Sequence, residues 1–320
     1  ENSTRKVLGL LSGVALKAQG FTQPYMAQQA SREDWLFVKE LERIFEIKEL
    51  TVTEEEIPDD IDLLIVLHPL NISEKTEYAI EQYIIGGGKA AIIVDPSARA
   101  VPDMSQAAAQ YGRQSASRSN TASLFTTLDV QYNELLVAAD SLNSTRVSSR
   151  SVPVQYPFWL SLDGDSFNHE QVITSQLNTM LLVEPGFFKP MPETEFEFTP
   201  LISTSISAGT ISSSKLALIT PQNTDMYTQI DGPLALAALV TGRFSATFPE
   251  KPAESQHARK HLTRASENNT VLLIADVDFI SNNYSLRKLN FMGQSITQPL
   301  NQNLAFLSNA LEFISGSTEL

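Results

Sequence analysis

At 320 residues, 42% of them apolar, the chain can bury a substantial core as one large domain or two ordinary ones. Its 37 Asp and Glu residues against 23 Lys and Arg leave a formal net charge of −14, which repels phosphate backbones and excludes nucleic acid as an expected partner. The absence of cysteine excludes disulfides, thiolate nucleophiles and Cys-ligated metals.

Neither a membrane span nor a secretory leader is evident in the sequence. No stretch approaches the ~18 to 20 consecutive apolar residues of a spanning helix, and no basic-then-apolar leader opens the chain. The sequence starts at Glu1 without an initiator Met and stops with SGSTEL just after a helical pattern. We therefore expect a soluble segment excised from a longer protein.

The chain opens with a strand pattern and then a helix pattern. Residues 5–13 are a short apolar run that ends at Gly13, as a buried strand and its turn do. Residues 31–45 predict a helix, because Ser31 begins a capping-box-like arrangement and apolar residues recur at helical spacing after it.

A second strand and helix lead to three consecutive glycines. Residues 62–68 are almost continuously apolar, as in a strand covered on both faces, and residues 73–85 predict a helix with Ser73 as its N-cap. A phosphate-binding loop needs its glycines after a strand and before a helix. Gly86–Gly88 instead follow the helix, and Lys89 opens the next strand, KAAIIVDP. The glycines therefore indicate a helix-to-strand turn.

This alternation predicts the class of fold. Three strands and two helices within about 95 residues imply parallel strands joined by right-handed crossovers. We therefore expect an α/β fold with an open, mostly parallel, doubly wound sheet. No G-x-G-x-x-G sequence occurs, so no dinucleotide site is implied and no cofactor is expected.

The middle of the chain changes in texture. Residues 101–123 are small, polar and rich in Ser, Ala and Gln, which predicts a long mobile loop. A helix and strand pair is expected over 124–140. Further strands are expected over 152–162, 198–205, 215–221 and 232–249, the last chosen over a helix because of its Thr, Gly and Phe content.

The end of the chain returns to the α/β pattern, with a buried strand in 269–282 and a helix over 303–316. We expect one compound globular unit. Residues 1–100 and 268–320 would form the α/β sheet core, 101–123 the mobile loop, and 124–267 a middle α/β and β-rich region packed on the core.

Polar residues follow the buried strands, where doubly wound sheets bind ligands. They are His68, Asp95, Asp276 and Asp278. One interpretation gathers them into a metal or acid–base site. The other, which we favour, is that they cap loops and bind backbone N–H groups, since no second His lies at ligand spacing nearby.

Other candidate motifs are weaker. In HARKH, His257 and His261 are four residues apart, but the surrounding stretch is polar and flanked by Pro, which favours a solvated helix or loop. No G-x-S-x-G elbow is present and no catalytic triad can be assembled, so no catalytic residue is assigned. The aromatic run PVQYPFWL is either core or a patch that binds a partner.

Three stretches together resemble a known family, the auxiliary extracytoplasmic component of gliding-motility-type ABC transport systems. They are residues 62–96 (DLLIVLHPLNISEKTEYAIEQYIIGGGKAAIIVDP), residues 156–162 (YPFWLSL) with 198–205 (FTPLISTS), and residues 271–317 (VLLIADVDFIS to NALEFISGS). The resemblance covers nearly the whole chain in the same order.

The resemblance implies a non-enzymatic domain at the extracytoplasmic, periplasmic face of the bacterial cytoplasmic membrane, held there by flanking helices outside this chain. It implies an ABC permease and its ATPase as partners, with a cell-envelope ligand as a further alternative. It also implies an amidotransferase-like or flavodoxin-like sheet that has lost its nucleophile. Nothing from the family transfers to residues 105–123 or to HARKH.

Two functions therefore remain open. The first is a non-enzymatic accessory domain of a membrane transporter. The second is a hydrolase or metal-dependent enzyme built on His68, Asp95, Asp276 and Asp278, which requires those side chains within ~3 to 6 Å of a common point in a pocket.

Overall fold

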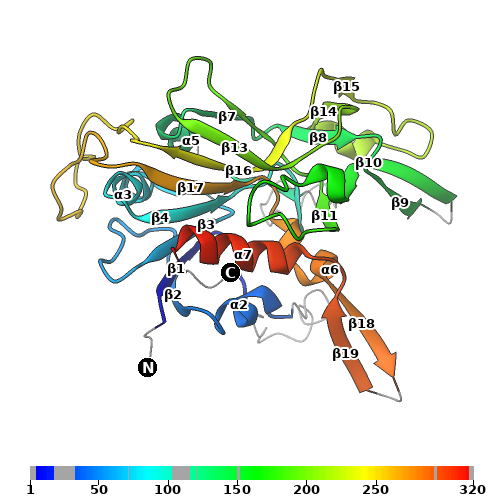
Figure 1. The fold of residues 1–320 in the computed structure, drawn as a ribbon, viewed down its shortest axis with the longest axis horizontal. Coiled ribbons are helices and arrows are strands. Elements are labelled where there is room, and N and C mark those ends of the chain that lie inside the picture. The colour runs from blue at the N-terminus through cyan, green and yellow to red at the C-terminus, as the bar shows by residue number, and fades with distance from the viewer. Residues whose placement is uncertain are drawn as a thin grey trace, which may run out of the picture.

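The computed structural model describes residues 5–17, 33–70, 72–102, 116–120, 122–149, 152–291 and 294–316. A nine-stranded sheet runs through its centre (Figure 1). Across the sheet the strands are β2 (Glu46–Leu50), β1 (Val7–Ser12), β3 (Leu63–Leu67), β4 (Lys89–Ile93), β17 (Asn269–Ile274), β16 (Ala235–Gly242), β12 (Phe188–Pro190) and β7 (Val130–Tyr132), while β13 (Glu197–Ser203) also pairs with β16.

The fold is α/β as expected, but the sheet is mixed, so the prediction of a mostly parallel sheet was wrong. The five strands from β2 to β17 run parallel to their neighbours, whereas β16, β12, β7 and β13 pair antiparallel. Antiparallel neighbours need no helical crossover between them. This explains why the middle region adds strands to the sheet with few helices.

Helices cover both faces of the parallel half. The helices α3 (Glu74–Ile85) and α5 (Ala122–Thr127) lie over one face, and α2 (Leu36–Leu41) and α7 (Asn303–Ile314) over the other (Figure 1). Successive strand residues alternate between the two hydrophobic clusters: Ile65 packs with α7, and Leu64 with α3. Burial on both faces explains the nearly unbroken apolar run of β3.

Several predicted elements are confirmed. The side chain of Ser73 caps α3 by accepting from the backbone N–H of Thr76. The N–H groups of Gly86, Gly87 and Gly88 all donate to carbonyls of α3, so none is directed at a ligand. Gly87 has a φ of 95°, which glycine adopts at no steric cost. The triple glycine is therefore a helix-to-strand turn.

Other elements differ from the prediction. The helix α2 is short, Trp35 precedes it without a side-chain cap, and Ser31 lies outside the described residues. The edge strand β2 was not predicted. The expected strand 215–221 is largely a 3₁₀ helix, η2 (Ser213–Leu218), because Leu216 alone is buried in it and a strand would need an alternating apolar face.

The rest of the chain forms small sheets and short helices around this core. The predicted mobile loop 101–123 falls mostly outside the described residues, but β5 and β6 pair at its ends. These elements are β5 (Ala98–Pro102) with β6 (Ala116–Ser117), β8 (Leu136–Asp140) with β14 (Ala208–Ser212) and β15 (Thr228–Gln229), β9 (Ser144–Ser149) with β10 (Val152–Leu162) and β11 (Met180–Val183), β18 (Leu286–Phe291) with β19 (Gln294–Pro299), and the short helices η1 (Gly164–Ser166), η3 (Asp278–Ile280) and α6 (Asn282–Ser285).

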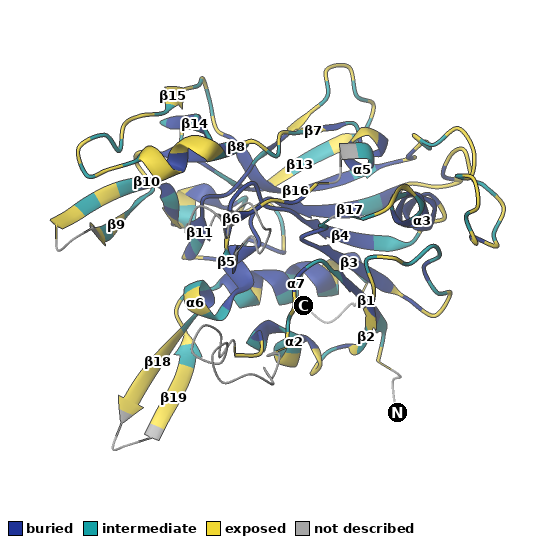
Figure 2. Cartoon of the chain, turned by 180° about the vertical axis from the view of Figure 1, so that it is seen from behind, coloured by how far each residue is buried: buried dark blue, intermediate teal, exposed yellow. Residues whose placement is uncertain are grey.

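No helix within the described ranges is long and apolar enough to cross a bilayer. Figure 2 shows the buried residues concentrated in the sheet and its covering helices, and the exposed ones concentrated in outer loops and in the β18–β19 hairpin.

Candidate functional site

The four residues singled out from the sequence lie at the carboxyl ends of β3, β4 and β17. These strands are adjacent and parallel, so their ends meet at one edge of the sheet. His68 follows β3, Asp95 lies two residues beyond β4, and Asp276 and Asp278 follow β17. All four are fully buried. The sheet therefore brings them to one end, as parallel strands require.

Three of them form a carboxylate cluster, which we call the Asp cluster: Asp95, Asp276 and Asp278. One oxygen from each lies within 4.8 Å of those of the other two. Oxygen ligands suit Mg²⁺ or Ca²⁺, so these three residues have the chemistry to hold a cation.

Backbone N–H groups already bind every oxygen of the Asp cluster. Asp95 accepts from Ser97 at 2.7 Å and Val277 at 2.8 Å. The Asp276 carboxylate accepts from Val183 at 2.6 Å and Phe279 at 3.1 Å. Both oxygens of Asp278 are likewise bound, by Arg99 at 2.8 Å and Ala100 at 2.7 Å. The cluster thus joins the ends of β4, β11 and β17 to the start of β5.

Burial makes these carboxyls weak acids. It raises the pKa of Asp95 and of Asp276 well above the usual range, and the charge of Asp278 adds to both effects. Burial also raises the pKa of Asp278, from 3.8 to about 7, against the lowering effect of its two N–H bonds. Three carboxylates this close cannot all be charged at neutral pH. Protons therefore remove part of the charge that a cation would otherwise have to balance.

The ring of His68 is hydrogen bonded to two serine hydroxyls rather than to the carboxylates. Its Nε2 is 2.8 Å from the Ser117 hydroxyl and its Nδ1 is 2.8 Å from the Ser119 hydroxyl, which also accepts from the backbone N–H of Asp95. Burial lowers the pKa of His68 from 6.5 to about 4, so the ring is neutral at pH 7. With a φ of 45° and no exposed surface, His68 serves as a buried junction between β3 and the loop after β6.

A second group of residues, which the sequence did not identify as a site, lies beside the Asp cluster. We call it the Arg99 cluster: Arg99, Tyr156, Trp159, Glu184 and Tyr284. The Arg99 guanidinium pairs with the buried Glu184 carboxylate, with Nε 2.6 Å from Oε1, and it lies 5.9 Å from the centre of the Trp159 ring.

Further contacts fix the Arg99 cluster. Glu184 also accepts from the Tyr156 hydroxyl at 3.1 Å and from the Ser97 hydroxyl at 2.7 Å. Tyr156 and Tyr284 both meet the Trp159 ring edge to face. The Arg99 side chain remains 41% exposed. The arrangement presents an oriented cation and aromatic rings at the surface. Of these residues, the sequence pointed only to the aromatic run of β10.

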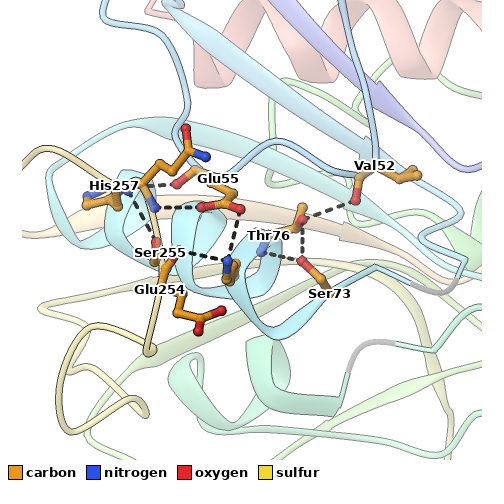
Figure 3. A network of polar contacts seen from close by, with 9 residues as sticks. Val52, Glu55, Ser73, Thr76, Glu254, Ser255 and His257 are labelled. Atoms are coloured by element: carbon orange, nitrogen blue, oxygen red, sulfur yellow. Dashed lines mark hydrogen bonds and ion pairs between the residues drawn. The ribbon is translucent and has the colours of Figure 1, made fainter.

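The HARKH segment has a structural role. His257 is buried, its Nδ1 lies 3.2 Å from the Glu55 carbonyl, and its ring meets Tyr78 of α3 edge to face. Figure 3 shows the surrounding network, in which Glu55 accepts from the backbone N–H of Gln256. His261 stacks against the same tyrosine ring. The two histidines thus fasten a long loop to α3.

Two surface hollows lie elsewhere. One, of about 470 Å³, is lined by the glycine turn together with Lys89 and Arg259. The second, of about 490 Å³, lies near Thr127, Arg243 and Arg264. Neither includes His68 or a member of the Asp cluster. The strand-end residues are therefore grouped, but they do not line these hollows.

Two solved structures show a distant likeness to the chain. The mmIFT52 N-terminal domain has a TM-score of 0.45 at 12% identity, covering 97% of this chain and 99% of that one. A putative ThuA-like protein from Bacteroides uniformis ATCC 8492 has a TM-score of 0.41 at 13% identity, covering 98% of this chain and 93% of that one. Scores this low assign no function.

No curated protein matches the chain in sequence. A family model described as "ABC-type uncharacterized transport system" matches residues 5–310, which is nearly the whole chain. This agrees with the resemblance in the strand-end blocks around Asp95 and Asp276. The chain belongs to this family of auxiliary components of ABC-type transport systems.

Proposed function

We propose that the chain is the non-enzymatic binding domain of an accessory subunit that works beside the permease and ATPase of an ABC transporter. Family membership over residues 5–310 is the observation that carries this proposal. Following the resemblance, the proposal includes an extracytoplasmic location in a bacterium and membrane anchoring through segments that flank the chain in its parent protein.

The geometry at the strand ends favours binding over catalysis. A general acid or base must reach the substrate within hydrogen-bond distance. Here His68 and the Asp cluster are fully buried, and their polar atoms are bound to neighbouring hydroxyl or backbone groups. The alternative of a hydrolase or metal-dependent enzyme at these four residues therefore has less support.

The Arg99 cluster is the surface that we propose contacts the partner. Trp, Tyr and Arg are the residues that most often dominate the binding energy of protein interfaces. Arg99 is already oriented by the buried Glu184 and by the Trp159 ring, so little side-chain freedom is lost when a partner binds. The Arg99 side chain is 41% exposed, and the N–H groups of a guanidinium suit a carbonyl or carboxylate acceptor.

We also propose kinship with amidotransferase-like and flavodoxin-like domains. The parallel strands follow the order β2-β1-β3-β4-β17, which is the 2-1-3-4-5 order of flavodoxin-like sheets. After β1 and β3, the backbone of Gly13 packs directly against that of His68, because a Cβ at Gly13 would lie 2.1 Å from the His68 carbonyl oxygen.

The test is to purify the full-length parent protein from its native membranes in mild detergent and identify what accompanies it. The proposal predicts co-purification of an ABC permease and its ATPase. Recovery of the parent alone, with a bound metal or small molecule, would favour the enzyme alternative.

The same preparation tests the surface. We expect Arg99→Ala to reduce recovery of the permease. Lys251→Ala, at an exposed site in the loop after β16, should leave it unchanged. Equal recovery with both variants would remove the Arg99 cluster from the proposal and leave the accessory role intact.

A further inference from the structure

The hairpin formed by β18 and β19 stands out from the body of the molecule. It projects as a two-stranded ribbon beyond the sheets and helices (Figures 1 and 2). Its base is fixed, because the Leu300 N–H donates to the Ser285 carbonyl and the Asn301 amide donates to the Tyr284 carbonyl. An isolated two-stranded hairpin is marginally stable in water, so a ribbon retained in this form calls for a role outside the core.

The two faces of the ribbon differ in chemistry. Opposite residues of an antiparallel pair share a face, and so do residues two apart. Leu289 pairs with Ile296, and their face continues to Arg287 and Gln298, which are hydrogen bonded to each other at 3.3 Å. Beyond the Leu286–Pro299 pair at the base, the other face is polar: Lys288 lies opposite Thr297 and is paired with Glu33. The ribbon is therefore amphipathic.

The aliphatic face is open to solvent. Leu289 is 41% exposed and Ile296 is 43% exposed. Alternation of this kind normally places the apolar face on a core. On this ribbon it instead presents two aliphatic side chains next to a cation.

Charge separates the ribbon from the rest of the chain. Residues 286–299 contain Arg287 and Lys288 and no Asp or Glu, in a protein of net charge −14. Six residues of strand extend about 20 Å, whereas charges in physiological salt are screened over about 8 Å. Lys288 is paired with Glu33, so Arg287 on the aliphatic face is the cation that can meet an anionic surface. Such a surface meets little screened repulsion from the acidic body where the ribbon extends away from its base.

The small area of the aliphatic face favours a bilayer over a protein as its partner. Two strands of six residues present a face of roughly 200 Å², from the rise per residue and the strand spacing, whereas a stable protein interface buries about 800 Å² on each partner. A second copy of the chain or another protein would need additional surface. A bilayer has no such requirement, because a few aliphatic side chains with adjacent cations suffice for a peripheral contact by a protein already near the membrane.

We propose that the β18–β19 hairpin contacts an anionic phospholipid surface, with Leu289 and Ile296 entering the interface and Arg287, on the same face, meeting the phosphates. This inference rests on the proposed membrane-proximal role of the domain. The contact would limit the orientations that the domain adopts above the membrane.

The test uses a fluorescent reporter in the full 320-residue chain. Leu289→Trp places an indole on the aliphatic face, and the chain is tethered by a terminal polyhistidine tag to vesicles with nickel-chelating and brominated lipids. Leu142→Trp is the matched control, since Leu142 is 69% exposed in the turn after β8. Native Trp35 and Trp159 contribute the same background to both variants.

We expect bromine quenching of the Leu289→Trp reporter in phosphatidylglycerol vesicles to exceed that of the control by about threefold or more, since quenching requires contact within the acyl region. Arg287→Gln in the reporter background should remove most of the difference, as should phosphatidylcholine vesicles or high salt. Ile296→Thr should reduce it while the aromatic circular dichroism stays unchanged.

Equal quenching of the two reporters would overturn the inference. So would quenching of the Leu289→Trp reporter that depends neither on lipid charge nor on the Arg287→Gln substitution. Either result would leave the accessory role untouched, because that role is decided by recovery of the permease. Conversely, loss of the permease with lipid contact retained would refute the accessory role alone.

Discussion

Replacing Asp278 by Asn tests whether the Asp cluster is held by backbone bonds and kept partly protonated by burial. Both oxygens of Asp278 accept backbone N–H groups, from Arg99 and Ala100. An Asn side chain offers one oxygen and turns an NH₂ group toward the other donor. A buried donor without an acceptor costs about 1–3 kcal/mol, so the variant should be destabilised by at least that amount at acidic pH.

The pH dependence gives the sharper expectation. The pKa of Asp278 is raised from 3.8 to about 7 in the folded state. Protonation of this carboxyl therefore stabilises the fold fully below the unfolded-state pKa, and that stabilisation is lost as pH rises through 7. Each whole-number difference between the folded and unfolded pKa of a group corresponds to about 1.4 kcal/mol of stability. The stability deficit of Asp278→Asn should therefore shrink between about pH 4 and pH 7, by an amount on the order of 3 to 4 kcal/mol.

The assay is urea unfolding of wild type and variant across that pH range. Thr204→Val is the control, because it removes a buried acceptor for the Leu234 N–H, at 2.8 Å, without removing a titrating group. Its deficit should be the same at every pH. A deficit of Asp278→Asn that stays constant or grows with pH would refute the assignment of a raised pKa to this carboxyl.

Three further results are expected. Gly13→Ala should destabilise the fold by about 3 kcal/mol or more in urea unfolding, because its Cβ would lie 2.1 Å from the His68 carbonyl oxygen. Gly87→Ala has open space around it but a φ of 95°, and it should cost about 1 kcal/mol. Equal costs for the two variants would contradict the close approach at Gly13. Glu184→Gln should cost about 1–3 kcal/mol by weakening the pair with the partly exposed Arg99, and a neutral result would show that the pair does not order the cluster. Added Mg²⁺, Mn²⁺ or Zn²⁺ should leave the melting temperature unchanged. A metal site at a metal concentration 100 times its dissociation constant would instead add about 2.7 kcal/mol to the free energy of unfolding. That result would favour the metal-dependent alternative.

Apart from the edge strand β2, the parallel half of the sheet could be predicted because its sequence signals are local. Apolar runs such as 62–68, the cap at Ser73 and the turn at Gly87 each lie within one element and its neighbour. The antiparallel half could not, since the pairing of β16 with β17 and β13 depends on contacts between distant segments. Local patterns indicate that a strand exists but not which strands lie beside it.

The same difference between local signals and contacts of distant segments explains which parts of the candidate site could be predicted. His68 and the Asp cluster follow parallel strands, so their placement at one edge follows from the fold class. The contact between Arg99 and Glu184 joins β5 to the end of β11, which belongs to a different sheet. No spacing in the sequence encodes how two sheets pack. The backbone bonds that saturate the carboxylates were expected in kind, as loop caps, but their partners were not.

We propose that this domain serves an ABC transporter without performing a reaction itself. The most direct test is affinity purification of the tagged full-length parent from native membranes, followed by identification of the proteins that elute with it. We expect an ABC permease and its ATPase to elute with the parent. Elution of the parent alone, with stoichiometric metal or substrate-derived ligand, would contradict the proposal.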